Sequence, residues 1–191
     1  MALPAKEISY TFADALAWEG QEHIEIIEGY PYMMAPPLRV HQKIVSELHR
    51  LISNFLHGKP CEVYPAPFAV RPFEAAGDAP ENVNTLLEPD ITVVCDPEKL
   101  DKYGCRGAPD MVIEILSPST RRQDMVVKYQ LYQRAGVLEY WIVDPETKTA
   151  AVYHLEEGRF NAAEVYTEKA MVPVSLWDGF SIDLREVFTE E

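Results

Sequence analysis

The sequence predicts an α/β fold in which helices flank a mixed central β-sheet that carries extra antiparallel strands. Between residues 88 and 145 the pattern reads strand, loop, strand, turn, helix, strand. Residues 38–56 repeat apolar side chains with a helical period, and hairpin-like segments stand at both ends of the chain. With 191 residues the chain can bury a sizeable core, and we expect one domain over residues 1–191.

Two strands are predicted at the centre of the sheet, in residues 88–95 and 109–116. The first is a β-branched run that begins at Asp90. The second is almost continuously apolar, as expected of a strand covered on both faces, but Glu114 interrupts it. A buried charge costs several kcal/mol unless it pairs, binds a cation or takes up a proton. Glu114 is therefore the most informative residue of the chain.

Asp90 is the geometrically sensible partner for Glu114. Asp110 shares the strand face of Glu114, but four residues along a strand span roughly 13 Å, too far for both to ligate one ion. Paired strands lie about 4.8 Å apart, so Asp90 on a neighbouring strand can be much closer. We expect Asp90 and Glu114 to form the pair, and the Pro109-Asp110 dipeptide to be a decoy.

A helix is predicted after the turn at residues 117–119. Thr120 and Gln123 have the spacing of a capping box, and Gly136 ends the helix. Asp124 and Lys128 are four residues apart, so they share a helix face that can look back at Glu114. A third strand follows in residues 137–143. Two carboxylates with a nearby lysine suit Mg²⁺ or Mn²⁺, with an ammonium to position a nucleophile or steady a phosphate.

Four segments in this region resemble one known family: EPDITVV, APDMVIEILSPST, DMVVKY and GVLEYWIVDP. They are similar to the Uma-type restriction endonucleases, within the PD-(D/E)xK nuclease superfamily. The resemblance implies a restriction-endonuclease-like core, a homodimer, and Mg²⁺- or Mn²⁺-dependent hydrolysis of phosphodiester bonds in DNA, with Asp90 and Glu114 as metal ligands. Superfamily members usually carry a lysine two residues after the second acid, where this chain has Leu116. The resemblance implies a lysine displaced onto the following helix, for which Lys128 is the candidate, with Asp124 beside it.

The N-terminal third supplies two further candidates. Residues 23–28 and 30–34 alternate like a hairpin around Gly29. The resemblance favours Glu25 in this hairpin as an additional acid near the site, with a solvated strand residue as the alternative. His41 is the polar residue on the apolar face of the predicted helix 38–56. It is either a core histidine with a satisfied hydrogen bond or, as the family's pattern suggests, part of the site.

The remaining elements are less specific. A short helix is expected over residues 10–18 with Thr11 as its cap, and residues 61–70 form a strand that two prolines confine to a sheet edge. Residues 71–84 read as a loop. An antiparallel pair is expected from residues 149–154 and 159–166, with the C-terminal tail packed on the sheet.

Three cysteines without CxxC spacing predict reduced thiols rather than a disulfide or zinc site. The N-terminus does not have the pattern of a signal peptide, and no apolar run approaches the roughly 20 residues of a spanning helix, so we expect a cytoplasmic protein without a membrane partner.

The net charge of −14 opposes binding to DNA, because phosphates are bound through lysine and arginine. Six basic residues, most of them flanking the proposed site, could form a local positive rim: Lys99, Lys102, Arg106, Arg121, Arg122 and Lys128. Two other functions stay open. The first is a non-catalytic nucleic-acid-binding or protein-interaction module that keeps the nuclease fold. The second is a metal-free hydrolase that uses two carboxylates as acid and base.

Overall fold

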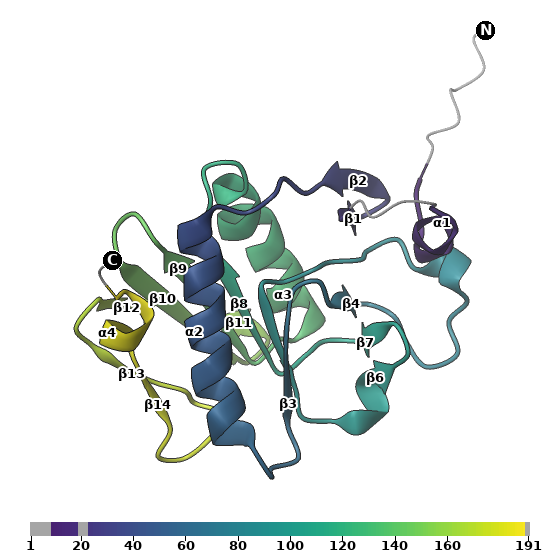
Figure 1. Ribbon diagram of the computed structural model, residues 1–191. Coiled ribbons are helices and arrows are strands. Elements are labelled where there is room, and N and C mark those ends of the chain that lie inside the picture. The colour runs from purple at the N-terminus through teal and green to yellow at the C-terminus, as the bar shows by residue number, and fades with distance from the viewer. Residues whose placement is uncertain (1–8, 19–22, 190–191) are drawn as a thin grey trace, which may run out of the picture.

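The computed structural model describes residues 9–18 and 23–189. Its centre is a seven-stranded mixed sheet with the strand order β11-β10-β9-β8-β5-β3, and β12 also pairs with β10 (Figure 1). β8 and β9 are parallel, whereas the other neighbours are antiparallel. The strands of this sheet are β3 (Glu62–Pro65), β5 (Ile91–Val94), β8 (Met111–Ile115), β9 (Glu139–Asp144), β10 (Thr149–Glu156), β11 (Arg159–Phe160) and β12 (Glu164–Thr167). The α/β class with a mixed central sheet and flanking helices is confirmed.

Helices cover both faces of this sheet. α2 (Arg39–Leu56) buries its apolar stripe, including Ile44, Leu48 and Ile52, against one face. The other face is covered by α3 (Tyr129–Ala135), which follows a π-helical segment (Gln123–Lys128) and ends at left-handed Gly136 as predicted. This helix is the crossover that a parallel β8 and β9 require.

The C-terminal segment packs on the α2 side of the sheet, as expected for the tail. It contains β13 (Met171–Pro173), β14 (Ser181–Asp183) and α4 (Leu184–Val187). Glu139, fully buried at the start of β9, fastens this segment because its carboxylate accepts hydrogen bonds from the Ser175 backbone N–H at 2.8 Å and from the Ser175 hydroxyl. Trp141 Nε1 donates to the other oxygen at 2.6 Å. This buried carboxylate therefore accepts hydrogen bonds from neutral donors on both oxygens, and the His154 imidazole lies 3.7 Å from Oε2.

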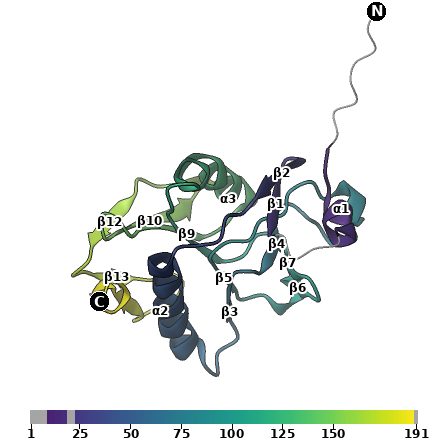
Figure 2. The same ribbon diagram turned by 45° about the horizontal axis from the view of Figure 1, so that its top comes forward.

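Two small sheets lie beside the main one. β1 (Ile24–Ile27) and β2 (Tyr30–Met33) form the predicted hairpin, and β2 leads through a short loop into α2 (Figure 2). The sequence did not predict the three-stranded sheet of β4 (Ala69–Arg71), β6 (Leu100–Asp101) and β7 (Gly104–Arg106). The expected strand 61–70 is therefore two strands, with β3 at the edge of the main sheet and β4 in the small one. The remaining short helices are α1 (Phe12–Ala17) and the 3₁₀ turns Pro80–Asn82 and Pro97–Lys99.

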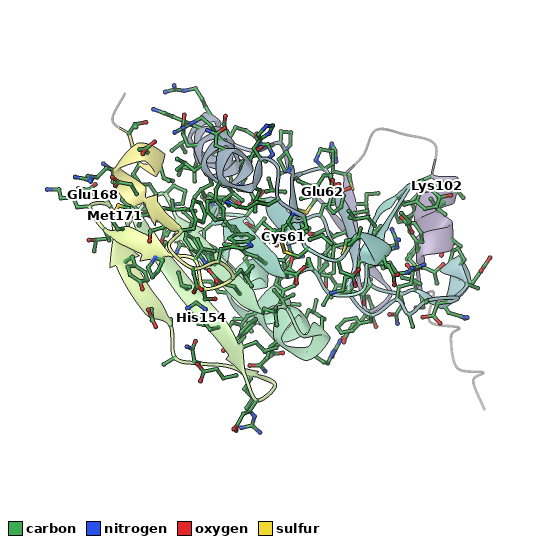
Figure 3. The ribbon with its side chains drawn as sticks, turned by 90° about the horizontal axis from the view of Figure 1, so that it is seen from below. Cys61, Glu62, Lys102, His154, Glu168 and Met171 are labelled. Carbon is green, nitrogen blue, oxygen red and sulfur yellow. A yellow bond between two sulfur atoms is a disulfide. The ribbon has the colours of Figure 1, made fainter. Side chains whose placement is uncertain are left out.

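The expectation of three reduced cysteines is wrong for Cys61 and Cys95, which form a disulfide (Figure 3). The reason is the strand register, because Glu62 on β3 is paired with Val94 on β5. One step further along this antiparallel pair, Cys61 and Cys95 face each other with their Cα atoms 3.9 Å apart. Cys105 is a buried free thiol. Within the described residues, no helix is both long and apolar enough to cross a membrane.

Candidate active site

Asp90 and Glu114 lie opposite each other at the end of the central strand pair. β5 and β8 are antiparallel with Ile91 paired to Ile113, so the next step of this register brings Asp90 to Glu114. The Asp90 backbone N–H donates to Glu114 Oε2 at 3.4 Å. The expected adjacency of these two acids is therefore found. Asp110 instead caps the far end of the pair, where its Oδ2 accepts from the Cys95 backbone N–H at 2.7 Å.

The Asp90 carboxylate is held from two sides. Its Oδ2 accepts the backbone N–H of Ile115 at 2.8 Å and lies 3.1 Å from His41 Nε2 on α2. Burial alone would lower the pKa of His41, but the hydrogen bond and charge of Asp90 outweigh burial and leave that pKa raised. Because both contacts use Oδ2, the other carboxylate oxygen is left for a ligand.

Lys128 joins three carboxylates that come from separate elements. Its Nζ lies 2.8 Å from Glu25 Oε1 on β1, 3.0 Å from Glu114 Oε1 on β8, and 3.5 Å from Asp124 Oδ1 one turn earlier in its own helix. All four side chains are at most 3% exposed. The structure therefore brings Lys128, Asp124 and Glu25 to Glu114, and Glu25 is not a solvated strand residue.

Neutral donors complete this cluster. Tyr132 OH donates to Glu114 Oε1 at 2.7 Å. Glu25 accepts the Glu88 backbone N–H at 3.0 Å and the Gln123 side-chain amide at 3.2 Å. The Gln123 half of the predicted capping box is therefore wrong, because the Gln123 amide donates to the buried Glu25 carboxylate and does not reach back to Thr120.

One ammonium faces three buried carboxylates, so the cluster has an excess of negative charge. Burial raises the pKa of Glu114 well above its usual value, although Lys128 opposes this, and the charges of Asp124, Asp90 and Glu25 raise it further. Burial likewise raises the pKa of Asp124. For Lys128, burial lowers the pKa, but the surrounding carboxylates outweigh burial and raise it. Lys128 therefore stays charged, and the carboxylates around it can bind a proton or a cation.

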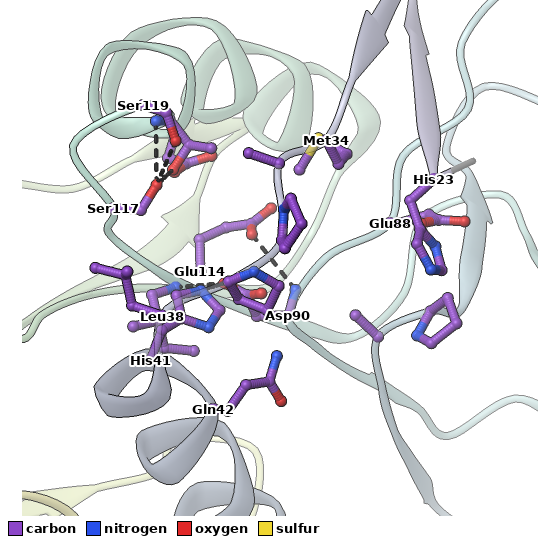
Figure 4. Close-up of a pocket in the computed structure, with 18 of the residues that line it drawn as sticks. His23, Met34, Leu38, His41, Gln42, Glu88, Asp90, Glu114, Ser117 and Ser119 are labelled. Atoms are coloured by element: carbon purple, nitrogen blue, oxygen red, sulfur yellow. Dashed lines mark hydrogen bonds and ion pairs between the residues drawn. The ribbon is translucent and has the colours of Figure 1, made fainter. Parts of the chain in front are cut away.

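These residues form the floor of a pocket of about 700 Å³ (Figure 4). Asp90, Glu114, Asp124, Lys128 and His41 all line it. Its walls include the loop from β2 into α2 and the turn after β8, where Ser117 Oγ lies 3.0 Å from both Ser119 Oγ and Thr120 Oγ1.

Positive charge is scarce among the residues that line this pocket in the part of the chain that is described. Of the six basic residues that could form a positive rim, Lys128 alone lines the pocket. Lys99 Nζ donates to the Ala108 carbonyl, and the Arg121 guanidinium donates to Asp144 Oδ2 at 3.1 Å. Arg106 likewise donates to the Glu98 carbonyl at 3.0 Å, so three of these six basic side chains are held by acceptors outside the pocket lining.

Sequence reasoning missed several members of the site. Tyr132 is part of the buried core, and its hydroxyl donates to Glu114; its position one turn after Lys128 was the available signal. His23 and Glu88 also line the pocket and pair at 3.1 Å between Nδ1 and Oε2. No local pattern links these two residues, which are 65 positions apart.

The donor set fits a hard divalent cation. Among residues 9–18 and 23–189, no three His, Cys, Asp or Glu side chains form a ready-made metal centre. Mg²⁺, however, keeps several waters and is commonly held by one or two carboxylates, which Asp90 and Glu114 supply. Asp124 Oδ1 is buried without a hydrogen bond, and its contact is the ion pair with Lys128. A bound cation would compensate the excess negative charge of these buried carboxylates.

Comparison with known proteins bears on the fold and on the family. A crystal structure described as a "putative nuclease belonging to DUF820" from Anabaena variabilis has the same fold, with a TM-score of 0.74 and 22% identity over 94% of this chain and 98% of that one. An uncharacterized protein of Synechocystis sp. is 29% identical over 142 residues, which are 73% of this chain and 70% of that protein. Residues 12–185 match the Uma2 family, described as "Putative restriction endonuclease". The chain therefore belongs to the Uma2 family.

Proposed function

We propose that this protein is a Mg²⁺- or Mn²⁺-dependent endonuclease that hydrolyses phosphodiester bonds in DNA. The observation that carries the proposal is the placement of Asp90 and Glu114 side by side at the floor of a pocket, with the Lys128 ammonium 3.0 Å from Glu114. Membership of a nuclease family supports it. A homodimer and a cytoplasmic location belong to the same proposal.

Each residue has a role that follows from its contacts. Asp90 and Glu114 would hold the cation, which supplies a Lewis acid that offsets phosphate charge and favours a water nucleophile. His41 and the Ile115 N–H fix the orientation of the Asp90 carboxylate. Lys128 places a positive charge where charge develops on the phosphoryl oxygens. Asp124 and Glu25 keep that ammonium charged and in place.

The test is Mn²⁺ binding, measured by calorimetry on the wild type and on Glu114→Gln. Glu139→Gln is the matched control, because Glu139 is also a buried carboxylate but does not line the pocket. We expect Glu114→Gln to lose binding and Glu139→Gln to keep it. Hydrolysis of DNA should then require Mg²⁺ or Mn²⁺ and stop in Glu114→Gln. Hydrolysis that survives chelation would contradict the metal dependence.

One observation favours the alternative of a non-catalytic module that retains the nuclease fold. Lys128 is already engaged by three carboxylates, and the chain carries a net charge of −14. If the folded wild-type protein does not bind Mn²⁺ and does not hydrolyse DNA in the presence of Mn²⁺, the interaction module is the better assignment.

A further inference from the structure

The walls of the pocket are mainly apolar. One wall is the loop from β2 into α2, which is rich in methionine and proline, and two more prolines come from the segment after β3 and from the turn after β8. These wall residues are Met33, Met34, Pro36, Pro37, Leu38, Pro67 and Pro118. Met33 and Leu38 are 74% and 59% exposed, so they lie at the mouth rather than in the core.

Positive charge is scarce in the same pocket. Lys128 is the one lysine or arginine among its lining residues in the described chain, and it is 1% exposed. Glu88, Asp90, Glu114 and Asp124 add carboxylates to the lining. The lining also offers a phosphate neutral donors, which are the hydroxyls of Ser117, Ser119 and Thr120 on the turn after β8 and the Gln42 amide on α2, and it includes the imidazoles of His23 and His41.

This lining does not suit a DNA duplex. A duplex carries two phosphate strands with paired, inward-turned bases, and proteins bind it by neutralising several phosphates with lysine and arginine. An unpaired strand has a lower charge density and can turn the faces of its bases toward apolar and aromatic side chains. Base faces match the methionine and proline wall, and one phosphate can then reach the hydroxyls and the floor of the pocket.

We propose that the pocket takes an unpaired strand of nucleic acid, with bases against the wall formed by residues 33–38 and the scissile phosphate at Asp90 and Glu114. The proposal rests on the proposed nuclease function and gives its substrate class. The mouth of the pocket, at Leu38 and Met33, selects single-stranded over duplex substrates.

The first measurement is fluorescence anisotropy with a labelled 12-nucleotide single strand and with the same strand in a duplex, in Ca²⁺, on the full-length wild type. We expect the single strand to bind at least about tenfold more tightly. Leu38→Glu, at an exposed wall position, should weaken binding of the single strand about tenfold. The matched control is Val165→Glu, because Val165 is 64% exposed on β12 and does not line the pocket. The control should bind like the wild type.

Equal or tighter binding of the duplex would overturn the proposal, as would equal effects of Leu38→Glu and Val165→Glu. Failure of the two proposals can be told apart. Hydrolysis in Mn²⁺ of the duplex as fast as the single strand would leave the nuclease assignment standing and reject the substrate class. Tight binding of the single strand without hydrolysis of either DNA would keep the substrate class and reject the nuclease assignment. No binding of either DNA would reject the substrate class.

Discussion

Two buried glutamates on adjacent strands show what distinguishes a site residue from a structural one. Glu139 is fully buried, and its carboxylate accepts hydrogen bonds from the Trp141 indole and from the N–H and hydroxyl of Ser175. Glu114 is 2% exposed, lines the pocket, and faces an ammonium and further acids. Both interrupt apolar strands in the sequence. The difference lies in the neighbours, because Glu139 is a single carboxylate with a hydrogen-bond donor for each of its oxygens. The Glu114 cluster instead gathers three carboxylates around one ammonium and keeps an excess of negative charge that a cation can offset.

Lys128→Met should destabilise the protein strongly in the absence of divalent cations. The change leaves Glu25, Glu114 and Asp124 buried without a counter-charge, and loss of one partner from a buried ion pair costs about 3–5 kcal/mol. Added Mn²⁺ should recover part of this loss, so it should stabilise the variant more than the wild type. Urea unfolding with EDTA and with Mn²⁺ measures both effects.

Lys148→Met is the control for this prediction. Lys148 pairs with Glu168 at 3.3 Å, but both side chains are more than 40% exposed, so its loss should change the free energy of unfolding by no more than about 0.5 kcal/mol. Equal destabilisation by the two variants would show that the carboxylate cluster does not depend on Lys128.

Asp144→Asn should make stability less dependent on acid pH. Burial would raise the pKa of Asp144, but hydrogen bonds from Arg121 and from backbone N–H groups outweigh burial and lower it. A carboxylate with a lowered folded pKa stabilises the fold above its unfolded pKa of about 3.9, and this contribution disappears as pH falls through the folded value. The difference in melting temperature between wild type and variant should therefore be full at pH 6 and shrink below about pH 3.9. A difference that does not vary with pH would contradict this.

At the scale of elements, the disulfide between β3 and β5 gives a direct test of the cysteine assignment. Cys105 is buried, and burial raises the pKa of its thiol to about 12, so it should not react with a thiol reagent in the native protein at neutral pH. We expect no reactive thiol in the native state, one after denaturation and three after reduction. Three thiols after denaturation without reductant would restore the prediction of reduced cysteines.

Loss of this disulfide should also lower stability. Cys61 and Cys95 are 34 positions apart, and a cross-link that closes a loop of that length raises the free energy of the unfolded chain by about 3.8 kcal/mol. Cys61→Ala should therefore lower the free energy of unfolding by an amount of this order, measured by urea unfolding without reductant. With excess reductant, variant and wild type should differ far less.

Elements with strong periodicity were predictable from the sequence, and elements that depend on distant partners were not. The α2 stripe, β5, β8 and Gly136 each carry their signal within one segment. The small sheet of β4, β6 and β7 carries no such signal, because strands of two or three residues depend on their partners. Its buried Arg71, which pairs with Glu74 and with Asp101 at 2.5 Å, is likewise explained by contacts 30 positions away.

At the scale of the whole molecule, the candidate site was predictable where adjacency follows from strand pairing. Asp90 beside Glu114 and Asp124 beside Lys128 follow from the geometry of a sheet and of a helix. The contact of Glu25 with Gln123, 98 positions apart, depends on how the hairpin docks over the helix. The apolar character of the pocket mouth also depends on docking, because residues 33–38 become a wall only when they meet the turn after β8.

The distribution of charge over the whole molecule predicts that binding of a single strand depends only weakly on salt. Proteins that bind DNA through many lysine and arginine contacts lose about 10³–10⁵ in affinity between 50 and 200 mM salt. This chain has a net charge of −14, and the lysine that lines its pocket is buried among acids. Contacts between bases and an apolar wall do not release counterions, so binding of a single strand should weaken by less than about tenfold over the same range. Anisotropy titrations in NaCl at constant Ca²⁺ measure this. A loss of 10³ or more would mean that a basic surface outside the pocket carries the binding, and that the apolar wall is not the site of recognition.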